Sequence, residues 1–204
     1  MTTEPHQARD LVADTRVTRL TVAPGWYTAE LGPEWDFRTP SGGVLMSIAM
    51  RAMQEELGNP EFRPVSANTH FCSPVPAGPL EIRVEVVRHG GAAAQLRAQL
   101  SSTTMPGPGL EVSATFGRER PGVDVIDVAP PVVESPDDLP PLERPALPGV
   151  GFEPPFFFNF DQRLALGHPW WTSDWQAGPA RMARWFRCKV KPCDAAGALD
   201  PLPI

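Results

Sequence analysis

Residues 39–57 read TPSGGVLMSIAMRAMQEEL, and this stretch decides the fold. It contains a predicted helix, 44–57, whose first ten residues include only two polar side chains, Ser47 and Arg51. A helix that is apolar on nearly every side has to be covered by other parts of the chain. The Gly-Asn-Pro sequence at 58–60 is typical of the end of a helix.

Segments with the alternating apolar and polar pattern of β-strands occur on both sides of this helix in the sequence. Two of them precede the helix, at 17–22 and 26–31. Four follow it, at 65–71, 80–86, 94–100 and 110–116. One buried helix and a series of one-sided strands predict an α+β fold in which an antiparallel sheet wraps around the helix.

Composition divides the chain of 204 residues into three parts. Residues 121–155 hold ten of the 26 prolines, and seven acidic side chains against one basic side chain. This segment alone accounts for the net charge of −6, and its proline content favours an extended linker over a packed domain. We therefore expect a first domain at 15–120, an acidic Pro-rich linker at 121–155 and a second domain at 156–204.

The expected second domain is too short to match the first. It offers two predicted strands, 156–164 and 180–191, and the first of them has Phe156, Phe158 and Phe160 on one face. Asp200 followed by proline is typical of the start of a helix. The sequence therefore predicts an incomplete second unit. Its unpaired edges and the apolar surface around 156–160 favour a homo-oligomer.

Composition also disfavours several classes of function. No apolar run reaches the roughly 18 residues of a membrane span, and the polar residues 1–10 lack the apolar part of a secretory signal, so we expect a cytoplasmic protein. Cys72, Cys188 and Cys193 lack metal-ligand spacing, which predicts reduced thiols and no metal site. Outside the linker the charges balance, which argues against a nucleic-acid partner.

Two motifs resemble the N-terminal half of double-hotdog acyl-CoA thioesterases of the thioesterase II-like family. The first is WDFRTPSGG at 35–43, which leads into the apolar helix. The second is HFCSPVPAGP at 70–79, followed by EVVRHG at 85–90. The resemblance covers residues 15–120 and extends more weakly into 156–201. It implies the hotdog fold, an antiparallel sheet around a central helix, with one complete unit and the start of a second.

The resemblance also implies a site for an acyl-CoA substrate and no cofactor. Gly42 and Gly43 would present the N–H groups of the helix N-terminus to the thioester carbonyl, which stabilises an oxyanion. Trp35 would line the acyl tunnel, and Arg88 would approach the phosphates of coenzyme A. Each residue also has a purely structural reading: a close helix entry for the glycines, core packing for Trp35 and a solvated charge for Arg88.

The sequence departs from the family pattern at the catalytic groups. Single-domain hotdog thioesterases often carry histidine where this chain has Ser41, and an acid where it has Met50. In the double-hotdog family the catalytic acid, hydroxyl and amide come from the second unit, which here would place them beyond Ile204. Asp200 is interpreted as a helix cap and not as that acid. The catalytic residues of this chain are therefore unknown.

The predicted function is hydrolysis of an acyl thioester to a free acid and coenzyme A, with loss of activity through the missing second-half residues as part of the hypothesis. A non-enzymatic acyl-CoA-binding or structural hotdog protein is one alternative. A hotdog enoyl-CoA hydratase or dehydratase is another. It needs an Asp/His pair at the helix entry, and Ser41 argues against it.

Overall fold

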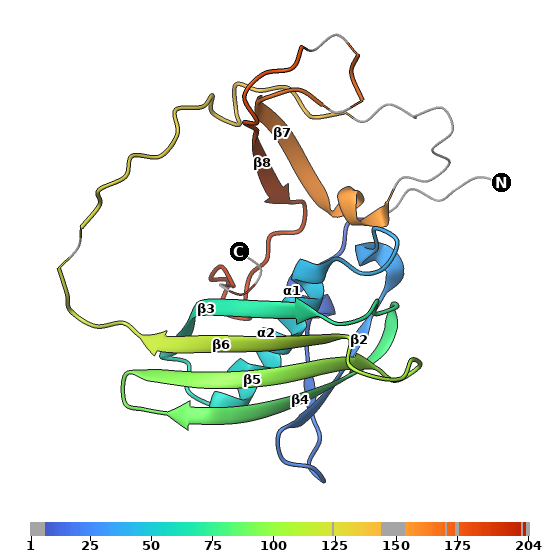
Figure 1. Cartoon of the computed structure of the whole chain (residues 1–204), viewed down its shortest axis with the longest axis vertical. Coiled ribbons are helices and arrows are strands. Elements are labelled where there is room, and N and C mark those ends of the chain that lie inside the picture. Colours follow the sequence, from blue (N-terminus) through green and yellow to red (C-terminus); the bar gives the residue numbers. More distant parts are fainter. Residues whose placement is uncertain are drawn as a thin grey trace.

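A six-stranded antiparallel sheet covers one long helix (Figure 1). The computed structural model describes residues 7–123, 125–143, 154–169, 171–173, 176–200 and 202. The helix is α2, Gly42–Leu57. The strand order is β1-β2-β4-β5-β6-β3, with bounds Thr18–Arg19 (β1), Trp26–Leu31 (β2), Phe62–Phe71 (β3), Gly78–His89 (β4), Ala93–Ser102 (β5) and Leu110–Arg118 (β6). The predicted hotdog fold is confirmed.

The alternating strand patterns place one face of the sheet against α2. In β4, Leu80, Ile82 and Val84 are buried while the residues between them are exposed. The register continues this apolar face across the sheet, because Ile82 pairs with Leu100 and Leu100 pairs with Leu110. The strand β4 is longer than predicted, since its backbone stays paired with β5 as far as His89, beyond its last buried side chain, Val84.

Helix α2 fills the space inside the curved sheet. Its sheet-facing side is fully enclosed, and Ile48 at its centre is 0% exposed. Ala49 and Ala52 are also completely buried, and their small side chains let the helix approach the strands closely. The helix ends at Gly58, whose φ of 61° lies in the left-handed region that glycine adopts without strain. The buried rod predicted at 44–53 is therefore confirmed.

Two short helical segments precede α2. The first, α1, spans Leu11–Asp14, and the side chain of Asp10 caps it by accepting hydrogen bonds from the N–H groups of Val12 and Ala13. The second is the 3-10 helix η1, Pro33–Trp35. The strand predicted at 17–22 is reduced to Thr18–Arg19, because the chain turns at 20–25 and leaves Val22 in solvent.

The strand predicted at 156–164 is wrong in its first half. Residues Pro155–Asn159 form a 3-10 helix, η2, and the strand β7 begins only at Phe160 and runs to Leu166. Proline at the first helical position favours the helical turn. The second predicted strand is found in shorter form as β8, Ala183–Cys188, which pairs antiparallel with β7.

The phenylalanine cluster of this segment packs on the first unit instead of forming an open apolar surface. Phe156 stacks on Phe37 with ring centroids 4.5 Å apart, and Phe160 meets the edge of Trp35 at 6.2 Å. The Asn159 amide donates a 2.9 Å hydrogen bond to the carbonyl of Glu34. The open surface predicted at 156–160 is therefore wrong, because the rings are half-buried against η1 and its neighbours.

The described part of the linker, residues 121–123 and 125–143, contains no helix or strand and makes a wide excursion between β6 and the β7–β8 ribbon (Figure 1). The helix predicted to begin at Asp200 lies largely outside the described residues. Asp200 itself accepts a 3.0 Å hydrogen bond from the N–H of Leu202, as an N-cap does. The second domain at 156–204 stays a prediction.

Candidate functional site

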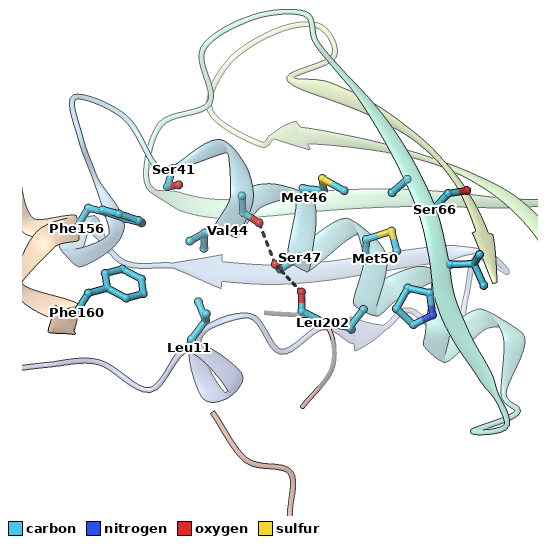
Figure 2. A pocket seen from close by; sticks show the side chains of 14 residues that line it. Leu11, Ser41, Val44, Met46, Ser47, Met50, Ser66, Phe156, Phe160 and Leu202 are labelled. Carbon is cyan, nitrogen blue, oxygen red and sulfur yellow. Dashed lines mark hydrogen bonds between the residues drawn. The ribbon is translucent and has the colours of Figure 1, made fainter. Parts of the chain in front are cut away.

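A cavity of about 470 Å³ lies between α2 and the edge strand β3 (Figure 2). The helix contributes residues at helical spacing, Gly43, Met46, Ser47 and Met50, which form the side of α2 that the sheet leaves uncovered. Ser41 and Val44 also line it at the start of the helix, and the rest of the lining comes from other parts of the sequence: Leu11, Pro64, Val65, Ser66, Ala67, Phe156, Phe160 and Leu202. The wall is predominantly apolar, as expected of a site for a hydrocarbon chain.

The N-terminus of α2 opens at one end of this cavity. Gly43 and Ser41 belong to the lining, and Figure 2 shows Ser41 beside the first turn of the helix. The first N–H groups of a helix have no acceptor within it, and the side chain of Ser41 makes no capping hydrogen bond to them. These donors, together with the positive end of the helix dipole, suit an anionic or polarised oxygen.

The two serines at the helix start differ in their hydrogen bonds. The hydroxyl of Ser47 donates a 2.9 Å bond to the carbonyl of Gly43, one turn earlier, and lies 3.5 Å from the carbonyl of Leu202. Its single proton is therefore engaged by backbone oxygens. Ser41, at the cavity wall, retains a hydroxyl that can bond to a ligand or to water.

Among the residues that the structure describes, the cavity lining includes no carboxylate and no imidazole. General-base activation of water, the usual requirement for thioester hydrolysis, needs such a group within hydrogen-bond reach. These walls can bind an apolar chain and stabilise negative charge on an oxygen. No described residue of the lining can act as such a base.

The two predicted glycines occupy different positions. Gly43 is exposed at the cavity entrance, and a side chain added there would meet only the hydroxyl of Ser41, at 3.9 Å. Gly42 lies outside the lining and under Phe71, because an added Cβ would be 2.7 Å from the ring atom Cζ. Close packing against Phe71 is therefore reason enough for glycine at 42.

The other two predicted site residues lie away from the cavity wall. Trp35 is 1% exposed, and its indole N–H donates a 2.9 Å bond to Asp14, so it supports the lining residues Phe156 and Phe160 from behind. Arg88 is exposed on β4, which is separated from β3 by the two strands β5 and β6. In this structure neither side chain faces the cavity.

The sequence alone did not indicate that Leu11 and Leu202 line the cavity, or that a buried ion pair lies near them. The guanidinium of Arg51 on α2 contacts the carboxylate of Asp200 at 2.7 Å, and both side chains are largely buried. Arg51 is one of only two polar residues in the apolar part of the predicted helix. A charge in such a position needs a partner, which is the signal that could have led to this pair.

Two features are absent from the described residues. No group of three or more histidine, cysteine or acidic side chains there is arranged to hold a metal ion. No helix in the same residues is long and apolar enough to cross a membrane.

Comparison with solved structures gives the same fold. A hot dog fold protein of unknown function from Alicyclobacillus acidocaldarius superimposes with a TM-score of 0.74 at 18% identity, covering 94% of this chain and 67% of its own. Acyl-CoA thioesterase II TesB2 from Mycobacterium marinum gives 0.65 at 20% identity, covering 95% and 64%. The tesB protein of Mycobacterium avium subs paratuberculosis gives 0.65 at 17% identity, covering 88% and 60%. The chain thus spans about two thirds of the length of these structures.

Comparison with sequence families is more specific. No curated protein sequence matches the chain. Residues 31–117 match the family described as the acyl-CoA thioesterase N-terminal domain. This range contains α2, β3 and the cavity-lining residues that they contribute. Residues 31–117 are therefore similar in sequence to acyl-CoA thioesterase N-terminal domains, and the hotdog fold of the chain agrees with that similarity.

Proposed function

We propose that this chain binds an acyl-CoA thioester, with the acyl chain between α2 and β3 and the thioester carbonyl at the N-terminus of α2. The observation that supports this proposal is the position of the cavity, which begins at Gly43 and follows the uncovered side of α2 as far as Met50. An apolar passage that starts at a set of free N–H groups matches a ligand with a polarised carbonyl and a hydrocarbon tail.

Binding energy comes mainly from the hydrocarbon tail. Each buried methylene group contributes about 0.8 kcal/mol, so a chain of several carbons in this cavity has enough burial for specific binding. Leu11, Met46 and Phe160 supply apolar contacts along its length. The carbonyl oxygen then lies near the amide of Gly43, where a developing negative charge is stabilised more than the neutral carbonyl is.

The proposed reaction is hydrolysis to a free acid and coenzyme A. Water attacks the thioester carbon, the negative charge passes to the oxygen held by the helix N–H groups, and the thiolate leaves as the carbonyl reforms, taking up the proton that the water has lost. The described lining supplies the oxyanion donors but no carboxylate or imidazole to accept the proton of water. The chain of 204 residues should therefore bind well and hydrolyse slowly, which keeps acyl-CoA binding without turnover as the second candidate function.

A comparison of two proteins tests this proposal. One is the chain of 204 residues, and the other is the same chain extended through a complete second hotdog unit. We expect both to bind a non-hydrolysable alkyl-CoA thioether in calorimetry, and only the extended protein to release thiol from acyl-CoA at a substantial rate. Absence of binding by both would refute the proposed site, and equal rates of hydrolysis would refute the role given to the second unit.

We also propose that the chain forms homo-oligomers. The support is β3, an edge strand of ten residues with Val65 69% exposed and Phe71 59% exposed. Unpaired edges of this length readily pair with another strand. Sedimentation velocity on the chain of 204 residues should show dimers or larger species at tens of micromolar, whereas a monomer at that concentration would contradict the proposal.

A further inference from the structure

The buried ion pair of Arg51 and Asp200 connects two segments that line the cavity and belong neither to α2 nor to the sheet. One contains Leu11 and the other contains Leu202. Arg51 is on α2 directly after the lining residue Met50. Its Nη1 contacts Asp200 Oδ2 at 2.7 Å, and its Nε donates a 2.7 Å hydrogen bond to the hydroxyl of Thr15. One guanidinium therefore joins the segment after α1 to the segment around Asp200.

Each partner of Arg51 is bonded in turn to a wall of the cavity. The hydroxyl of Thr15 donates a 2.6 Å bond to the carbonyl of Leu11. Asp200 accepts a 3.0 Å bond from the N–H of Leu202 through its other oxygen, Oδ1. Leu11 and Leu202 both line the cavity, as does Ser66 of β3 (Figure 2), and the two leucines are called the leucine wall below.

Both oxygens of Asp200 are occupied in this arrangement, and its side chain is only 8% exposed. These two contacts make Asp200 a link between the guanidinium of Arg51 and the backbone of Leu202. The buried charge of Arg51 in turn needs the carboxylate of Asp200 as its partner. Its Nη2 is already buried without a hydrogen-bond partner among the described residues. Removal of either charge would leave the other buried and unpaired.

We propose that Arg51 and Asp200 form a clamp that positions Leu11 and Leu202, and that this clamp sets the width of the acyl cavity. The inference rests on the proposed function and deepens it: Asp200 is a positioning residue for the acyl chain, with no contact to the reacting carbonyl. With the clamp closed, the cavity accepts a narrow, unbranched acyl chain. With the clamp broken, the leucine wall moves away from β3 and bulkier acyl groups fit.

An experiment without ligand measures how well Leu202 covers the side chain at position 47. In the variant Ser47→Cys, the new thiol lies beneath the carbonyl of Leu202, since Ser47 is 8% exposed and its Oγ is 3.5 Å from that oxygen. Labelling by N-ethylmaleimide, followed by peptide mass spectrometry, gives the rate at this site, with exposed Cys72 as the internal reference. Adding Asp200→Asn, which keeps an oxygen for the Leu202 cap, should raise the rate at least tenfold.

The matched control is Glu85→Gln in the same Ser47→Cys background. It makes the same acid-to-amide change in an exposed ion pair between β4 and β5, where Glu85 and Arg97 are 3.9 Å apart. It should leave the labelling rate unchanged. A second variant, Leu202→Ala, keeps the ion pair of the clamp and removes the leucine side chain from the wall, so it should also accelerate labelling. It serves as the test if Asp200→Asn fails to fold. An unchanged rate in Leu202→Ala, or in folded Asp200→Asn, would overturn the proposal.

A ligand experiment then tests the effect on acyl width. Dissociation constants are measured for two CoA thioethers, one with a straight alkyl tail and one with a branched tail of equal carbon number. We expect Asp200→Asn and Leu202→Ala to shift the ratio of the two constants toward the branched tail by about tenfold or more, and Glu85→Gln to leave it unchanged. An unchanged ratio would refute the width claim. If neither thioether binds the unmodified chain, the proposed function fails, while the labelling rates still decide whether the clamp holds the wall.

Discussion

Replacing Ile48 by alanine is expected to lower the free energy of unfolding by about 3–4 kcal/mol. The side chain is completely buried at the centre of α2, where the helix packs against the sheet. Truncation there removes buried methyl groups and leaves a cavity that the surrounding strands cannot close. Ile48→Ala tests the enclosed core directly, because it changes neither charge nor helix propensity unfavourably.

The control for this prediction is Met46→Ala, two residues earlier in the same helix. Met46 is half-buried and lies on the cavity side of α2, so its loss should cost only about 1 kcal/mol. Urea unfolding of both variants, followed by circular dichroism, gives the two free energies. Equal costs would mean that the sheet does not enclose one side of α2 in preference to the other, which contradicts the fold.

Replacing Gly43 by tryptophan should weaken binding of an alkyl-CoA thioether by about 100-fold while the protein stays folded. The backbone at Gly43 is ordinary helix, and an added side chain has open space around it, so the substitution brings no strain. The bulky ring then occupies the cavity entrance next to Ser41. The expected loss corresponds to about 3 kcal/mol, the scale of the apolar burial that a displaced acyl chain gives up.

Gly43→Ala separates occlusion from a change in the helix itself. Alanine keeps the backbone N–H and adds a single methyl group, so binding should remain within a few-fold of the unmodified chain. Calorimetry with the same thioether measures both variants, and the thermal midpoint checks that each is folded. If Gly43→Trp binds as tightly as Gly43→Ala, the ligand does not enter at the N-terminus of α2.

The core could be predicted from sequence because its signals are local. The near absence of polar residues in 44–53 and the period-two pattern of 80–86 each determine which side chains are buried, whatever their partners are. Their combination leaves few arrangements other than a sheet around a helix. The family motif at 35–43 adds the N-terminus of the helix as a ligand site, and Gly43 does line the cavity.

The rest of the site depends on long-range contacts that local patterns do not encode. Leu11 and Leu202 are far apart in sequence, yet both line the cavity, and Arg51 bonds to Thr15 and Asp200, each of which is hydrogen-bonded to one of the two leucines. The segment 156–159 has the alternating phenylalanines of a strand, yet the helical turn wins because its rings pack against Trp35 and Phe37. Tertiary packing of aromatic side chains outweighs strand propensity there.

Placement of the remaining predicted residues follows from sheet topology. Strand order puts β5 and β6 between β4 and β3, so Arg88 cannot line a cavity at the β3 edge. This order is not apparent from a series of similar alternating strands, because antiparallel strands of equal length can pair in several ways. Trp35 is close in sequence to the lining residue Ser41, but its indole N–H bonds to Asp14 and its ring is buried in the core.

The most direct test of the proposed site is a crystal structure of the chain with a bound alkyl-CoA thioether. The tail should lie between α2 and β3 in contact with Met50 and Leu202, with the sulfur close to the amide of Gly43. A tail bound elsewhere, for example in the smaller cavity of about 220 Å³ beside Trp185 and Arg187, would contradict the proposed site.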